Sequence, residues 1–86
     1  MRLDKYLKVS RLIKRRTMAK EVAEQGRIQI NGQVAKAGAN IKIGDEVVIQ
    51  FGQKKVTIRV DRLEESTRKE EAATLYTLLK EEKVNE

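Results

Sequence analysis

At 86 residues the chain is long enough for one domain with a small core, and 19 Lys and Arg against 13 Asp and Glu give it a net charge of +6. It contains neither Cys nor His, which excludes disulfides, zinc sites built from these residues and the common nucleophile–base pairs. We therefore expect a protein that is not an enzyme and that holds no metal or cofactor.

The chain also lacks the apolar segments that a membrane requires. No run approaches the roughly 20 apolar residues that span a bilayer, and charges occupy the N-terminus where a signal peptide would be apolar. We expect a cytoplasmic protein with no membrane partner.

Positive charge is concentrated at the start of the chain. Residues 1–36 carry ten Lys or Arg and three acidic residues, whereas residues 64–86 carry four and seven. Such a gradient is typical of a face that binds a polyanion, followed by an acidic tail.

Residues 2–13 have the spacing of a short amphipathic helix, with Leu3, Tyr6 and Leu7 on one face and basic residues on the others. Asp4 falls in the first turn, where a carboxylate suits the helix dipole. The same carboxylate could instead brace a nearby basic side chain, and the sequence leaves both interpretations open.

A second helix is predicted from Thr17, as its N-cap, to Gln25, with Gly26 as its C-cap. The three consecutive cations of residues 14–16 stand immediately before this start, where the helix dipole disfavours positive charge. A bound phosphate would relieve that conflict, so this cluster is a candidate anion site.

A tight hairpin follows. Residues 27–30 alternate like a strand, Asn31-Gly32 is the strongest short signal for a type I′ turn, and residues 33–35 return. Lys36 lies near Arg27 across the expected pairing. These two cations either extend the basic surface onto the sheet or only solubilise it.

Two further strands are predicted at residues 46–50 and 56–60. Residues 64–86 differ in kind, because Thr67 and Glu70 fit a capping box and an apolar face follows at helical spacing. We expect a terminal amphipathic helix that docks on the sheet in preference to a protein partner. Its apolar residues are Ala72, Leu75, Tyr76, Leu78 and Leu79.

Several segments together resemble the S4 RNA-binding domain, a family named after a small-subunit ribosomal protein. They are residues 2–7, Arg11 with Arg16 and Ala19, residues 26–32 with Val34 and Lys36, and residues 43–47. The resemblance implies an α+β, S4-like (alpha-L) fold with two N-terminal helices packed on a small, mostly antiparallel sheet. We expect this domain at residues 1–63 and a C-terminal helical extension at residues 64–86.

The resemblance also implies that the two helices and the hairpin form a basic face against structured RNA. Many members have a serine where this chain has Arg15, so the cluster is denser here. The candidate RNA-binding residues are Arg2, Asp4, Lys5, Arg11, Lys14, Arg15, Arg16, Lys20, Arg27 and Lys36.

Stand-alone members of the family suggest a function. Those with a tail like residues 70–76 act in ribosome-associated quality control, or are small heat-shock proteins that bind stalled large subunits, and the shorter tail here favours the former. The resemblance implies a protein that contacts ribosomal RNA of the obstructed large ribosomal subunit and peptidyl-tRNA, and we expect it to be a monomer. A tailing factor on the same subunit would then extend the stalled chain.

Two other functions are weighed against this one. A structural or assembly protein bound permanently to ribosomal RNA would need the same basic face. A small DNA-binding regulator is disfavoured, because the second helix exposes few side chains that read bases and has its basic cluster before its N-terminus.

Overall fold

The computed structural model describes residues 1–83, and its secondary structure is two helices, five strands and one short 3₁₀ turn. In chain order the elements are α1 (Leu3–Val9), α2 (Arg16–Glu24), β1 (Ile28–Ile30), β2 (Gln33–Val34), β3 (Glu46–Phe51), β4 (Lys54–Val60), η1 (Ala72–Leu75) and β5 (Tyr76–Lys83).

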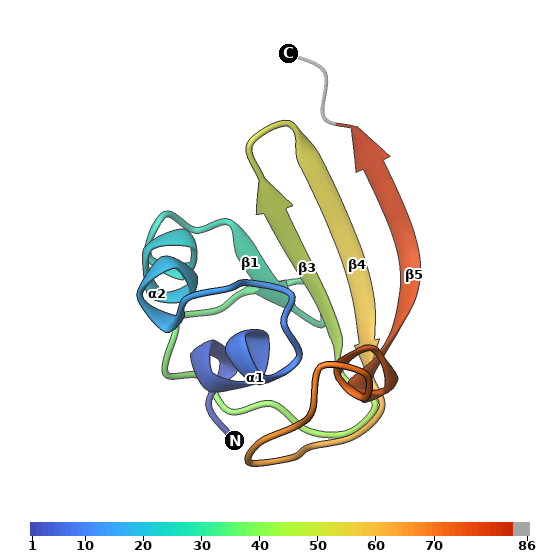
Figure 1. Ribbon diagram of the computed structural model, residues 1–86. Helices are drawn as coiled ribbons and strands as arrows, with labels where there is room; N and C mark the ends of the chain where they lie inside the picture. Colours follow the sequence, from blue (N-terminus) through green and yellow to red (C-terminus); the bar gives the residue numbers. More distant parts are fainter. Residues whose placement is uncertain (84–86) are drawn as a thin grey trace.

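The five strands form one antiparallel sheet in the order β2-β1-β3-β4-β5. Figure 1 shows α1 and α2 on the same side of this sheet, with β3, β4 and β5 extending beyond them. Because a strand alternates its side chains between two faces, every second residue of β3 and β4 points at the helices. The core lies in that layer, and its fully buried side chains include Leu3, Tyr6, Leu7, Ile28, Ile49, Ile58, Val60 and Leu75.

The predicted hairpin is confirmed. Asn31 and Gly32 have φ values of 51° and 86°, as a type I′ turn requires at both central positions. The Asn31 side chain also accepts a hydrogen bond from the Glu46 backbone N–H at 2.9 Å and donates one to Asp45 at 3.1 Å. These contacts tie the hairpin tip to the start of β3.

Both predicted helices exist, with different bounds. The first ends at Val9, because Arg11 adopts a left-handed backbone with φ 63° and turns the chain away. The second begins at Arg16 with Arg15 at the N-cap, so the prediction of Thr17 as N-cap was wrong. Gly26 ends that helix as predicted, in the left-handed conformation with φ 75°.

The predicted C-terminal helix at residues 64–86 is wrong over the described residues, and residues 84–86 lie outside them. One 3₁₀ turn buries Ala72 and Leu75, and the chain then continues as β5, which pairs antiparallel with β4. Thr67 forms no capping box, since its hydroxyl donates to the Arg68 carbonyl. The edge of β4 has backbone N–H and C=O groups that a paired strand can satisfy with hydrogen bonds and a docked helix cannot. This pairing decides the structure of residues 76–83, although their apolar residues are spaced as in a helix.

The carbonyl oxygen of Leu75 fixes this C-terminal segment to the core. It accepts hydrogen bonds from the Tyr6 hydroxyl at 2.6 Å, the Asp61 N–H at 2.9 Å and the Arg62 N–H at 3.1 Å. Burial raises the pKa of the Tyr6 phenol above its ordinary range, so this group remains a donor. Helix α1 is thereby linked to the end of η1, immediately before β5, 69 residues later.

Replacing Tyr6 by Phe should lower the free energy of unfolding by about 1 kcal/mol, because the hydroxyl is lost while the ring still fills the core. Urea denaturation measures this difference. Tyr76→Phe, at a tyrosine that is only partly buried, is the control and should change stability by less than half as much. Equal stabilities of the Tyr6→Phe protein and the wild type would contradict the anchoring role of this hydrogen bond.

Candidate nucleic-acid interface

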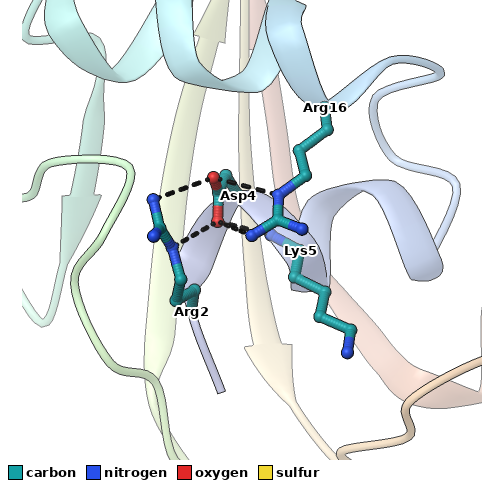
Figure 2. Close-up of polar contacts among 4 residues, drawn as sticks. All are labelled: Arg2, Asp4, Lys5 and Arg16. Carbon is teal, nitrogen blue, oxygen red and sulfur yellow. Dashed lines mark hydrogen bonds and ion pairs between the residues drawn. The ribbon is translucent and has the colours of Figure 1, made fainter.

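A buried carboxylate joins two of the candidate RNA-binding arginines. Asp4 is fully buried, and Figure 2 shows its two oxygens between the guanidinium groups of Arg2 and Arg16. Arg2 donates from Nε at 3.2 Å and from Nη2 at 3.3 Å, and Arg16 donates from Nε at 3.1 Å and from Nη2 at 3.4 Å. The Lys5 backbone N–H donates a fifth hydrogen bond at 2.8 Å.

The position of Asp4 follows from how α1 begins. This helix has no side-chain cap, and the loop before β3 takes that role, since the Ala39 carbonyl accepts from Leu3 N–H at 2.8 Å and the Ala37 carbonyl from Asp4 N–H at 3.1 Å. A side chain at Gly38 would come within 3.7 Å of the Arg2 guanidinium. The loop therefore fixes the start of α1 and lies directly beneath Arg2.

The charge conflict at the start of α2 is partly resolved within the fold. Arg15 at the N-cap has extended backbone and makes no side-chain cap, and the first turn contains no acidic residue. Asp4 supplies the missing negative charge from α1, through its contacts with Arg16. The prediction that a bound phosphate alone relieves this cluster is thus corrected for Arg16, while the Lys14 and Arg15 side chains remain exposed.

The cluster keeps its charges at neutral pH and leaves them accessible. Burial by itself would raise the pKa of Asp4, but the hydrogen bonds from Arg16, Lys5 and Arg2 outweigh it and hold the pKa below its ordinary value. The side chains of Arg2 and Arg16 are 51% and 41% exposed, respectively. Each guanidinium carries five N–H donors and uses two of them on Asp4, so donors remain for a phosphate.

Asp4 itself is excluded from direct contact with RNA, because its oxygens are buried and occupied. Of the two interpretations left open by the sequence, the structure supports bracing: this carboxylate positions Arg2 and Arg16. It also joins α1 to α2 by an ion pair between residues 12 apart.

The other candidate residues lie at several places on the surface. Lys5 points away from the arginine cluster in Figure 2 and pairs with Glu65 of the loop after β4. Arg11 and Lys14 line a separate pocket. The remaining candidates are also exposed, and no described contact joins them to Asp4; they are Arg15, Lys20, Arg27 and Lys36.

Two residues that contribute to these sites were not predicted from the sequence. Gly38 carries no charge, and its only signal was the loop composition of residues 38–40. Lys69 belongs to a segment predicted as helix, although it lines the same pocket as Arg11. Among residues 1–83, no cluster of three or more Asp or Glu that could hold a metal ion is found, and no helix is long and apolar enough to cross a membrane.

Replacing Asp4 by Asn should lower the free energy of unfolding at about pH 7 by about 1–3 kcal/mol, because two guanidinium groups lose their shared counter-charge. Since folding lowers the pKa of Asp4, its contribution is present above the ordinary Asp value and is lost as the pH falls from about 4 through the folded pKa. The stability difference between the Asp4→Asn protein and the wild type should therefore shrink in acid, as urea unfolding at about pH 7 and about pH 3 can measure.

Glu21→Gln makes the same chemical change at an exposed site on α2 and should alter stability by less than about 0.5 kcal/mol. If Asp4→Asn is no more damaging than this control at neutral pH, the buried carboxylate does not hold the helices together.

Comparison of this chain with known proteins identifies its family. The S4 domain family matches residues 1–47, which include both helices and the hairpin. A Bacillus subtilis protein named RQC P-site tRNA stabilizing factor is 66% identical over 86 residues, covering 100% of both chains. A protein of the same name from Streptococcus pneumoniae is 54% identical over 86 residues, covering 100% of this chain and 98% of that protein.

A solved structure has a similar fold. Heat shock protein 15 of Vibrio cholerae, described as trimeric, aligns with a TM-score of 0.85 at 32% identity, covering 92% of this chain and 81% of that one. The predicted fold of two helices on an antiparallel S4-like sheet is confirmed, apart from the C-terminal helix. The chain belongs to the S4 domain family, in which proteins named RQC P-site tRNA stabilizing factor are its relatives of high identity.

Proposed function

We propose that the protein is a non-enzymatic RNA-binding factor of ribosome-associated quality control. It acts in the cytoplasm, as a monomer, on large ribosomal subunits obstructed by a nascent chain. There it contacts ribosomal RNA and peptidyl-tRNA, and by holding the peptidyl-tRNA it supports a tailing factor that extends the stalled chain. The names of the relatives support the pathway and the P-site tRNA as partner.

The observation that carries this proposal is the pair of arginines oriented by Asp4. Both guanidinium groups are about half exposed, and both are held by a buried anion instead of moving freely. Arginines held in this way lose little conformational entropy when they bind, and their planar forks suit phosphate oxygens. A basic face built on this pair binds the backbone of structured RNA without reading its sequence.

A neutral substitution of Arg16 tests the proposal. Charge reversal would place a second acid beside Asp4 and would also destabilise the fold, so Arg16→Gln is the better variant. We expect it to weaken binding to large subunits carrying peptidyl-tRNA at least about tenfold, because a charged hydrogen bond to phosphate contributes about 1.5–3 kcal/mol. Co-sedimentation with purified subunits at fixed salt measures the affinity.

Arg59→Gln is a closely matched control. Arg59 is 50% exposed and pairs with Asp61 at 2.9 Å, much as Arg16 pairs with Asp4, but it lies on β4 away from the helices. This variant should bind within about twofold of the wild type, since it removes the same charge from outside the basic face. Equal losses from both substitutions would mean that only net charge matters, and no loss from Arg16→Gln would remove this residue from the interface.

Occupancy separates this function from that of a structural ribosomal protein. A rescue factor should be enriched on large subunits that carry obstructed nascent chains, because peptidyl-tRNA supplies part of its binding surface. Quantitative mass spectrometry of subunits sorted by the presence of peptidyl-tRNA measures this ratio. Similar occupancy on all large subunits would favour the structural or assembly role.

A further inference from the structure

A second basic pocket lies outside the Asp4 cluster. It is formed where the end of α1 and the following loop meet the segment between β4 and η1. Four cations and two hydroxyl groups line it, from Lys8, Arg11, Lys14, Ser66, Thr67 and Lys69. Glu65 also lines it, and this carboxylate pairs with Lys5.

One residue of the pocket, Arg11, has a strained backbone. Arg11 follows the C-cap of α1 with φ 63°, a left-handed position that glycine occupies most easily. A residue with a Cβ costs roughly 1 kcal/mol in that conformation. Despite this strain, Arg11 contributes a long cationic side chain to the pocket, which Lys8 in the last turn of the helix also lines.

The segment after β4 supplies the other half of the pocket. Ser66, Thr67 and Lys69 are far from α1 in sequence, and they lie outside residues 1–47, which the S4 domain family matches. The Lys5–Glu65 ion pair and the hydrogen bond from the Tyr6 hydroxyl to the Leu75 carbonyl hold this segment against α1. The pocket is therefore a feature of the complete fold.

We propose that this pocket binds a phosphate of the RNA backbone, next to the contact made by Arg2 and Arg16. Convergent cations, together with the Ser66 hydroxyl, suit a backbone phosphodiester, whose two non-bridging oxygens share one negative charge and accept several hydrogen bonds at once. Lys14 is two residues before Arg16, so a single RNA strand can reach both sites. An acidic peptide is the less suitable ligand, because its carboxylates are spaced along a flexible chain that must be ordered on binding, whereas the phosphates of structured RNA are already held in place.

This inference rests on the proposed function, and a double variant tests it separately. Lys8→Ala with Lys69→Ala removes one cation from each half of the pocket and leaves every arginine in place. Binding to large subunits carrying peptidyl-tRNA should weaken about tenfold, and the salt dependence of log K should become shallower by about 0.7–0.9 for each phosphate that the variant no longer binds. Lys8→Arg with Lys69→Arg should restore the wild-type affinity and slope.

Lys80→Ala with Lys83→Ala removes the same charge from β5, outside the pocket, and should leave affinity within about twofold. The inference is overturned if the pocket variant binds as well as this control while Arg16→Gln still binds weakly. It is also overturned if the pocket variant loses an acidic protein partner and keeps its RNA affinity. If the wild type does not bind the subunits, the proposed function fails, and the inference fails with it.

Discussion

The buried carboxylate of Asp4 is the interaction on which the basic face depends. Helices α1 and α2 are packed against each other, and the one fully buried carboxylate accepts from Arg2, at the N-cap of α1, and from Arg16, at the start of α2. Without it, Arg2 and Arg16 would repel each other and would move freely. With it, the fold holds two charged groups in fixed orientations, and the ion pairs offset the cost of burying the carboxylate.

This arrangement makes the N-terminal half one structural unit that presents the exposed arginines. The loop beneath Arg2 supplies carbonyls that cap α1, and the same loop leads into β3, where the hairpin tip is fixed by Asn31. A change in the core that moves α1 would therefore also move the exposed guanidinium groups. The C-terminal segment adds stability through Leu75, and it completes the second basic pocket.

Local signals in the sequence predicted the hairpin and the positions of the basic residues. A type I′ turn requires positive φ at both central positions, and Asn-Gly is the pair that adopts such values most readily. The hairpin could therefore be predicted with its register. The basic residues near both helices also stand out in sequence, and the S4-like pattern predicted one basic face, of which the structure brings Arg2 and Arg16 together at Asp4. What the sequence left open was the partner of Asp4, because residues 4 and 16 belong to different helices, whose relative orientation is a tertiary property.

Residues 76–83 show where local reasoning fails. Their apolar residues fit helical spacing almost as well as strand alternation, and only the open edge of β4 decides between the two. The pocket lined by Lys8 and Lys69 was not predicted either, since its two halves are far apart in sequence and meet only in the folded chain.

A cryo-electron microscopy map of the protein on a large ribosomal subunit with bound peptidyl-tRNA would test the central claim most directly. The arrangement around Asp4 predicts RNA phosphates within hydrogen-bond distance of the Arg2 and Arg16 guanidinium groups, with Asp4 still between them as in Figure 2. A map in which α1 and α2 face solvent while the sheet contacts the RNA would contradict it.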